Sequence, residues 1–180
     1  MVNNYIIVFE RDNRMGYGFD FTCSKCGEQY SASCGVGFEF PQVYQELLKD
    51  IKNGKYGSEW QKLALSDETV AVDAERYLYV CGKCGGWAVE SGLSLYVAND
   101  MDVAQKSREK RNWTVSRAAA FVAPFELKED YHLLKRRVHK CSGCGSRMHK
   151  ATDIEAYNLK CPHCGSVPDE NTVRSEIMWD

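Results

Sequence analysis

The 180-residue sequence predicts an α+β protein built from two small antiparallel β units, the first of which carries a helical insert. Two observations indicate this class. Eight of the nine cysteines fall in four pairs of one spacing, and on either side of the pairs apolar residues alternate with polar ones, as in β-strands. Between the first two pairs, a stretch with helical periodicity interrupts the strands. The chain is long enough for one compact domain or two small ones.

Each cysteine pair has the pattern C-x-x-C-G, and we number these turns knuckles 1 to 4 in chain order. Two intervening residues let one tight turn direct both sulfurs at a common point, so two knuckles supply the four thiolates of a tetrahedral metal site. The glycine is expected at positive φ, where a Cβ would clash. The pairs are Cys23 and Cys26, Cys81 and Cys84, Cys141 and Cys144, and Cys161 and Cys164.

We expect knuckles that follow one another in sequence to share a metal. Knuckles 3 and 4 are separated by 16 residues, which is typical of four-cysteine zinc sites. Knuckles 1 and 2 are separated by 54 residues, which costs only about 1 kcal/mol more in closure entropy. That cost is small beside the free energy of metal binding, so joining knuckle 1 with 3 and 2 with 4 stays open. The expected sites are Cys23, Cys26, Cys81 and Cys84 (site 1) and Cys141, Cys144, Cys161 and Cys164 (site 2).

The expected cofactor is two Zn²⁺ ions. A thioredoxin-like redox couple needs one C-x-x-C in a βαβ context rather than four, and the three-cysteine run of common ferredoxins is missing. Mononuclear iron in a rubredoxin-like knuckle is the alternative, because iron and zinc both accept four thiolates in tetrahedral geometry. The ninth cysteine, Cys34, is interpreted as a turn or core residue, with a reactive thiol as the alternative.

Apolar periodicity places the elements around the knuckles. Strands are expected before and after knuckles 1 and 2, including one run from Val70 to Val80 and another from Trp87 to Val97. A helix begins at Pro41 and ends at Asn53-Gly54. A second short helix is expected from Ser58, with Gln61 completing a capping box.

These elements divide the chain into three segments. We expect an N-terminal zinc ribbon at residues 1–98 with its helical insert at about 40–66, a basic linker at 99–124, and a C-terminal zinc ribbon at 125–180. The last segment begins with a helix over 126–138 and ends with a strand over 174–179. The apolar stripe of the insert helix is expected to pack on the sheet of its own ribbon; the alternative is that it fits a groove of a partner protein.

Charge is unevenly distributed along the chain. Residues 103–150 carry 12 Lys and Arg against 4 Asp and Glu, and such a region is suited to phosphate. We therefore name Lys135, Arg136 and Arg137 as candidate contacts to nucleic acid. The alternative is that these cations are solvated and neutralise the thiolate shells, since a metal dication with four thiolates carries a net −2.

The sequence contains no motif of a known catalytic site. A Gly-rich phosphate loop, a G-x-S-x-G elbow and an H-E-x-x-H helix are all missing. Four cysteines close a metal site, whereas a catalytic metal keeps an open position. The longest near-apolar run, Ala118–Phe125, is too short for a membrane helix, and no secretory signal is recognised. We expect a cytoplasmic protein without enzymatic activity.

Several short motifs resemble a group of uncharacterised bacterial tandem zinc-ribbon proteins. The resemblance covers about residues 15–180, and it implies that the eight paired cysteines are the metal ligands but implies no activity. Residues 1–14 lie outside it, which predicts Met15 as the native start. The motifs are the four knuckles, Gly35-Val-Gly37, Phe40-Pro41-Gln-Val-Tyr44, Pro124-Phe125-Glu-Leu-Lys128 and Met178-Trp179-Asp180.

The leading hypothesis from sequence is a non-enzymatic protein with two structural zinc sites that acts as an interaction module for a protein partner. Zinc would replace a core that small ribbons are too small to provide. Two alternatives stay open. One is a nucleic-acid-binding adaptor that uses the basic region at 103–150, and the other is a rubredoxin-like iron electron carrier.

Overall fold

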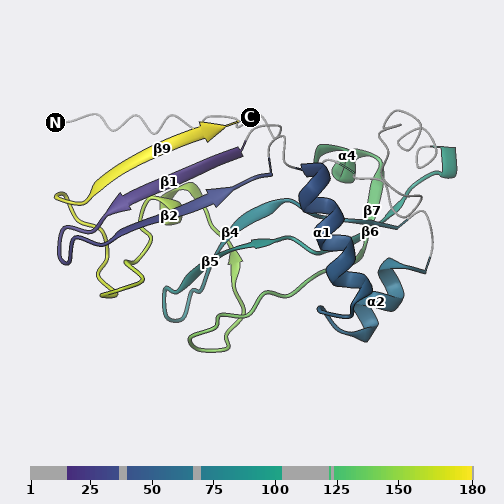
Figure 1. Cartoon of the computed structure of the whole chain (residues 1–180), viewed down its shortest axis with the longest axis horizontal. Coiled ribbons are helices and arrows are strands. Elements are labelled where there is room, and N and C mark those ends of the chain that lie inside the picture. Colours follow the sequence, from purple (N-terminus) through teal and green to yellow (C-terminus); the bar gives the residue numbers. More distant parts are fainter. Residues whose placement is uncertain (1–15, 37–39, 67–69, 103–121, 123, 180) are drawn as a thin grey trace.

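The computed structural model describes residues 16–36, 40–66, 70–102, 122 and 124–179 (Figure 1). These residues form a mixed α and β structure in which three small antiparallel sheets have the strand orders β2-β1-β9, β3-β6-β7 and β5-β4-β8. The elements are β1 (Gly16–Thr22), β2 (Gln29–Cys34), α1 (Phe40–Lys52), α2 (Ser58–Ala64), β3 (Val70–Val72), β4 (Arg76–Val80), β5 (Trp87–Ser91), β6 (Leu95–Ala98), α4 (Pro124–Glu129), β7 (Tyr131–Lys135), β8 (His149–Lys150), α5 (Asp153–Ala156) and β9 (Val173–Trp179).

The second half of the chain pairs with the first half in reverse order. Strand β7 pairs with β6, β8 pairs with β4, and β9 pairs with β1, all antiparallel. Figure 1 shows the consequence, with the last strand lying beside the first at one end of the molecule. The expected division at 1–98 and 125–180 does not follow this pairing, because each sheet combines strands from both segments. The fold is nested.

Two of the sheets are built in the same way, and we call them the first and second units. The first unit is the β1–β2 hairpin with β9, and the second is the β4–β5 hairpin with β8. In both, the first strand of the hairpin is central and the strand from the second half of the chain lies beside it. The units therefore form an internal repeat that the expected sequential ribbons do not describe.

The two units pack against each other through aromatic and aliphatic side chains. Phe19 and Phe21 of β1 share one buried cluster with Tyr30 of β2 and Leu78 of β4, and the partly buried Trp87 packs against it. Burial of these large side chains stabilises each by roughly 1.5–3 kcal/mol. Cys34 is fully buried in this cluster, in agreement with its interpretation as a core residue.

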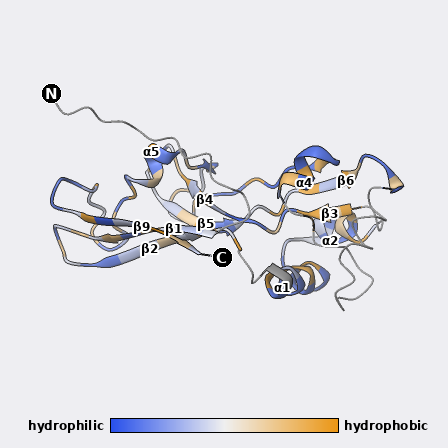
Figure 2. Cartoon of the chain, turned by 90° about the horizontal axis from the view of Figure 1, so that it is seen from above, coloured by the Kyte–Doolittle hydropathy of each residue, from blue (hydrophilic) through white to orange (hydrophobic). Residues whose placement is uncertain are grey.

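The helical insert packs on the third sheet. The apolar stripe of α1, from Tyr44 to Ile51, shares a core with Val72 of β3 and Leu95 of β6. Figure 2 shows α1, α2, β3 and β6 at the end of the molecule away from β2 and β9. The expectation that this stripe is covered by the protein's own sheet is confirmed, so the stripe is not offered to a partner.

Local structure differs from expectation in three places. The helix expected over 126–138 ends at Glu129 and gives way to strand β7, because residues 131–135 complete a sheet with β6. Gly57 rather than Ser58 caps α2, and no side chain caps it, while the Gln61 side chain donates to the Lys52 carbonyl. The single runs at 70–80 and 87–97 each break into two strands in different sheets.

Two expectations fall on residues outside the described part of the chain. Most of the basic linker at 99–124 lies at positions 103–121 and 123, and the proposed start at Met15 lies in 1–15. Within the described residues, no helix is both long enough and apolar enough to cross a membrane.

Candidate metal centres

All four knuckles adopt one backbone conformation. In each, the amide of the first cysteine donates to the carbonyl five residues later, and the glycine amide donates back to the carbonyl of that first cysteine, at 2.8–2.9 Å. The four glycines, Gly27, Gly85, Gly145 and Gly165, have φ of 75°, 71°, 68° and 72°. A Cβ disfavours this conformation, which confirms the sequence-based reason for the glycine.

The first unit gathers knuckles 1 and 4. The Sγ atoms of Cys23 and Cys164 are 3.7 Å apart, and those of Cys26 and Cys161 are also 3.7 Å apart. Cys23 and Cys161 are buried, whereas Cys26 is exposed and Cys164 is half-buried. Knuckle 1 is the turn of the β1–β2 hairpin, and knuckle 4 reaches it through the chain that leads into β9.

The second unit gathers knuckles 2 and 3 in the same arrangement. The Sγ atoms of Cys81 and Cys144 are 3.5 Å apart, as are those of Cys84 and Cys141. The first cysteine of each knuckle is again the buried one. Knuckle 2 is the turn of the β4–β5 hairpin, and knuckle 3 precedes β8.

The observed pairing corrects the sequence-based one. Knuckles 1 and 2 do not share a site, and neither do knuckles 3 and 4; the cross-braced alternative of 1 with 3 and 2 with 4 is also wrong. Strand pairing is the physical reason, because β9 brings knuckle 4 to the first hairpin and β8 brings knuckle 3 to the second. All eight predicted ligand cysteines fall in two clusters, which are Cys23, Cys26, Cys161 and Cys164, and Cys81, Cys84, Cys141 and Cys144.

Both clusters fit a metal ion of tetrahedral geometry. Within each cluster all four ligand atoms lie within 4.8 Å of one another. A tetrahedron of sulfurs at ~2.3 Å from a central ion has edges of ~3.8 Å, close to the 3.5 and 3.7 Å separations. The same separations exceed the ~2.05 Å of a disulfide bond. Each cluster therefore has the size of a four-sulfur cage around one ion.

Two thiols of the first cage have pKa values that are shifted in opposite directions. A hydroxyl hydrogen bond from Ser166, helped by the amide of Cys26, lowers the pKa of Cys23 to about 6. At Cys26 an amide hydrogen bond from Glu28 lowers the pKa, but loss of hydration and the neighbouring thiols outweigh it and raise the pKa to about 12. Four thiolates so close together repel one another, and a dication removes that cost.

Serine hydroxyls next to the sulfurs were not predicted from the sequence. The Ser166 Oγ lies 3.3 Å from the Cys23 Sγ and 3.0 Å from the Cys164 Sγ. In the second unit, the Ser146 hydroxyl and amide lower the pKa of Cys144 to about 6. The signal was present, because knuckles 3 and 4 both read K-C-x-x-C-G-S, whereas knuckles 1 and 2 both read C-x-K-C-G. Each cage takes one knuckle of each kind.

The two cages are connected through the residue before knuckle 4. The Trp87 Nε1 donates to the Lys160 carbonyl at 2.8 Å, and the Lys160 Nζ donates to the Cys84 carbonyl at 2.8 Å. The Tyr30 hydroxyl donates to the Leu159 carbonyl at 2.9 Å. Knuckle 4 is thus held both by its own unit and by the second one.

The histidines near knuckle 3 do not bond to the cages. His139 is buried, stacks on Tyr79 and lies 2.5 Å from Glu90 through its Nδ1. His149 lies 2.8 Å from Glu155 through its Nε2. His163, within knuckle 4, is exposed. These contacts fix the segments on either side of knuckle 3.

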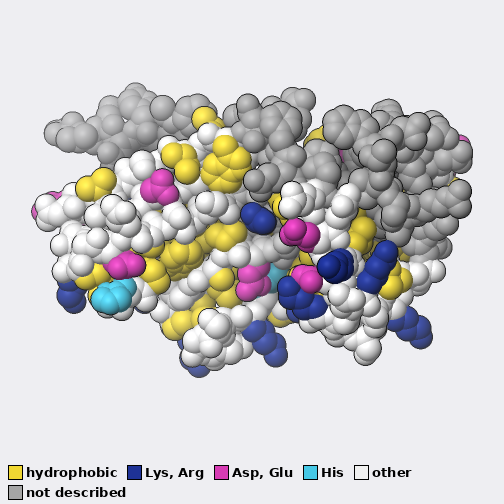
Figure 3. All heavy atoms as spheres, viewed as in Figure 1, with side chains coloured by type: hydrophobic (Ala, Val, Ile, Leu, Met, Phe, Trp, Pro, Cys, Tyr) yellow, Lys and Arg dark blue, Asp and Glu magenta, His cyan; other side chains and the backbone are white. Residues whose placement is uncertain are grey.

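Two of the three candidate nucleic-acid contacts are engaged within the chain. Lys135 pairs with Glu59, and Arg137 lies over the Trp60 ring at 5.3 Å. Arg136 is exposed. Figure 3 shows basic and acidic side chains intermixed on the face that it presents. Lys135 and Arg137 therefore have partners within the chain, whereas Arg136 is open to solvent.

A second polar cluster lies where the units meet the third sheet. The buried Asp73 carboxylate accepts from the Tyr77 hydroxyl at 3.1 Å, and burial raises its pKa. Burial and the nearby Asp73 raise the pKa of Glu75 to about 7, and its Oε1 has no hydrogen-bond partner. These groups and Lys150 line a cavity of about 340 Å³. No role was predicted for these residues from the sequence.

No family model, curated protein or solved structure matches this chain. What the chain can do follows from its own geometry, in which two four-sulfur clusters could each hold a metal ion.

Proposed function

We propose that this chain is a zinc-binding, non-enzymatic protein whose two four-cysteine sites are structural, and that it acts as an interaction module for a protein partner. Each unit is then a zinc ribbon assembled from distant segments. The carrying observation is that each cage joins a hairpin from the first half of the chain to a knuckle from the second half. Reduced thiols suit the cytoplasm, which we propose as its location.

Four sulfurs per site favour a structural role. Such a site is complete, so it leaves no position for substrate or water, and its binding free energy becomes folding free energy. Zinc has no redox chemistry and no geometric preference that the cages would resist. The resemblance in the knuckles and in the flanking motifs supports the same assignment.

Metal analysis tests this proposal. Reduced protein purified without added metal is expected to contain two zinc ions per chain, to be colourless, and to lose its cooperative unfolding transition when a strong chelator removes them. Protein that contains no ion and keeps its transition in chelator would contradict the proposal.

An iron electron carrier is the second candidate. The observation that favours it is that Cys26 and Cys84 lie at the surface, where a partner could exchange electrons with the site. The same metal analysis distinguishes it, since ferric thiolate sites are red and contain iron.

The nucleic-acid adaptor is less favoured, because Lys135 and Arg137 already have partners within the chain. Its test is retention on nucleic acid at ~50 mM salt, where phosphate contacts are strong. Loss of that retention on neutralising Lys135, Arg136 and Arg137 would support it, and no retention would exclude it.

A further inference from the structure

Strand β9 lies at the edge of the first unit and exposes apolar side chains. It pairs with β1 over its whole length, from Gly16 opposite Trp179 to Thr22 opposite Val173. No strand of the described residues pairs with its other side. Val173 is 66% exposed and Ile177 is 42% exposed. Folded proteins protect such edges, because a row of open amides and carbonyls recruits another strand.

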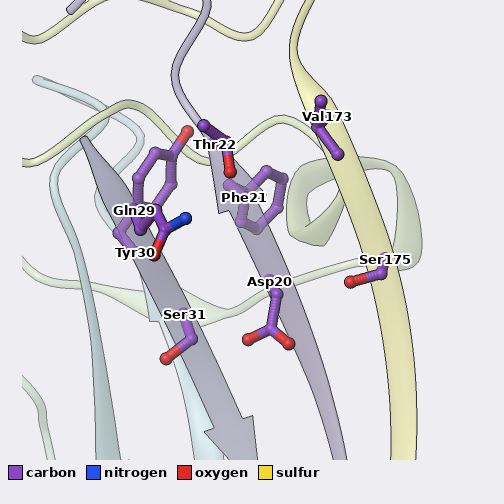
Figure 4. Close-up of a pocket in the computed structure, with 8 residues that line it drawn as sticks. All are labelled: Asp20, Phe21, Thr22, Gln29, Tyr30, Ser31, Val173 and Ser175. Atoms are coloured by element: carbon purple, nitrogen blue, oxygen red, sulfur yellow. The ribbon is translucent and has the colours of Figure 1, made fainter. Parts of the chain in front are cut away.

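The two faces of β9 carry different chemistry. Val173, Ser175 and Ile177 share the outer face of the sheet, where Figure 4 shows Val173 and Ser175 beside Asp20 and Thr22 of β1. That face holds a shallow hollow of about 440 Å³. Arg174 and Glu176 lie opposite Phe21 and Phe19, so they share the other face. Within residues 173–177 the edge therefore presents an apolar pair on one face and opposite charges on the other, and the exposed Met178 follows on the charged face.

The order of these residues is complementary to itself. If a second β9 is placed antiparallel with Ser175 opposite Ser175 of the partner subunit, Arg174 lies opposite the partner's Glu176. In the same register Val173 lies opposite the partner's Ile177. Each of these contacts occurs twice around the two-fold axis. Opposite charges and β-branched apolar pairs at directly facing positions stabilise antiparallel strands.

Neighbouring registers do not have this property. Centring the pair on Glu176 places two carboxylates opposite each other, and centring it on Arg174 places two guanidinium groups together. Centring it between Ser175 and Glu176 would place residues of opposite faces across from each other, which a two-fold antiparallel pairing does not allow. Like charges at facing positions are destabilising. One register alone among these satisfies both faces.

We propose that β9 is a self-association edge, which pairs antiparallel with β9 of a second copy about Ser175 and joins the two first units into one six-stranded sheet. The charged side chains are already held along the strand. The Tyr157 hydroxyl donates to Glu176, and Arg174 donates to the Asp169 carbonyl at 3.0 Å. An interface in which a surface patch meets its own copy is the commonest form of protein dimer. The proposal is independent of the identity of the metal.

Sedimentation velocity on the full metal-loaded chain tests this pairing by charge reversal. A single-strand interface is small and of the weak class, so concentrations should extend to about 500 µM. The wild type is expected to shift from 20.5 kDa toward twice that mass. Arg174→Glu alone and Glu176→Arg alone place like charges in both pairs and should weaken the dimer by about tenfold or more. The double variant R174E/E176R restores opposite charges and should restore the dimer.

Each variant is first compared with the wild type in metal content and melting temperature, so that misfolding is recognised. If Arg174→Glu fails to fold, Glu176→Arg with the double variant still gives the comparison. A second readout is amide exchange in β9, which should slow as the wild-type concentration rises.

Three results would overturn the proposal. The first is a wild type that stays monomeric over the whole range, and the second is a dimer that the double variant does not restore. The third is a monomer that dimerises only when residues 1–14 are removed, which would assign the β9 edge to the chain's own N-terminal segment.

Discussion

The two units contain the same four-sulfur cage, but they differ greatly in how many residues of the second half of the chain pair with the central strand. In the first unit β9 pairs with β1 at seven positions, whereas in the second β8 pairs with β4 at only two. The knuckles are separated by residues 27–160 in the first unit and 85–140 in the second, a difference worth only about 0.8 kcal/mol of closure entropy. On the proposed function, strand pairing and metal would together stabilise the first unit, whereas the second unit would depend mainly on metal.

Removing one ion from each unit gives the largest expected contrast. In Cys81→Ser/Cys84→Ser, segment 139–150 keeps few backbone bonds to its hairpin, so its amide protection should fall by about 100-fold or more. In Cys23→Ser/Cys26→Ser, β9 keeps its ladder with β1 and should lose less than about tenfold. Hydrogen exchange measured by mass spectrometry compares the two segments. Equal losses would show that the two units depend on metal alike.

The serine hydroxyls sharpen the comparison at the level of one ion. Ser166→Ala removes a hydrogen bond to thiolate in the first unit, and Ser146→Ala is the matched change in the second. Loss of such an outer contact lowers metal affinity by about tenfold. Competition with a chromophoric chelator should show one ion weakened and the other unchanged in each variant. A variant that weakens both ions equally would contradict the assignment of each serine to one cage.

Glu75 tests the contact between the units through pH. It lies next to Gly35 at the end of the first hairpin, whose amide donates to the Arg76 carbonyl at 2.9 Å. Its pKa is about 7 in the folded chain against 4.5 as the ordinary value. Between these values the folded state binds more protons than the unfolded state, so the stability contributed by this group falls as pH rises.

Glu75→Gln should therefore stabilise the metal-loaded protein, and the gain should grow by about 1 kcal/mol between pH 6 and 8 after discounting for partial exposure. Urea unfolding at the two pH values measures it. The same change at the exposed Glu46 on α1 is the control. A gain that is independent of pH would show that the Glu75 charge is not the cause.

The sequence predicted which cysteines form the clusters, but not which knuckles share a cluster. The C-x-x-C-G turn is local, so eight cysteines and four positive-φ glycines follow from spacing alone. Which knuckles share a cage depends on the pairing of β1 with β9 and of β4 with β8. The alternation of Phe19 and Phe21 with polar residues predicts a strand, but it does not predict which strand lies beside it. The loop-closure entropy differs too little between the possible knuckle pairings to favour one of them. The Lys and Ser positions separate knuckles 1 and 2 from knuckles 3 and 4, but no physical rule requires a cage to take one of each kind, so this difference does not select the pairing.

Other differences between prediction and structure also arise from tertiary contacts. Residues 131–135 carry charges that suit a helix end, yet they form β7 because β6 offers an open edge. The α1 stripe was predicted correctly, since a 3.6-residue period is a local property. Asp73 and Glu75 were missed because alternation assigns them to a strand, and burial of their carboxylates depends on three sheets meeting.

The pairing of the knuckles is the central claim, and two four-cysteine variants with cobalt as the probe test it most directly. Replacing the four cysteines of knuckles 1 and 4 with serine leaves all four cysteines of the second cage. This variant should therefore bind one Co²⁺ with the charge-transfer spectrum of four thiolates. Replacing the four cysteines of knuckles 1 and 2 leaves knuckles 3 and 4, which lie in different units and each supply only two thiolates. This variant should therefore show no such spectrum. A four-thiolate spectrum in the second variant and none in the first would contradict the nested fold.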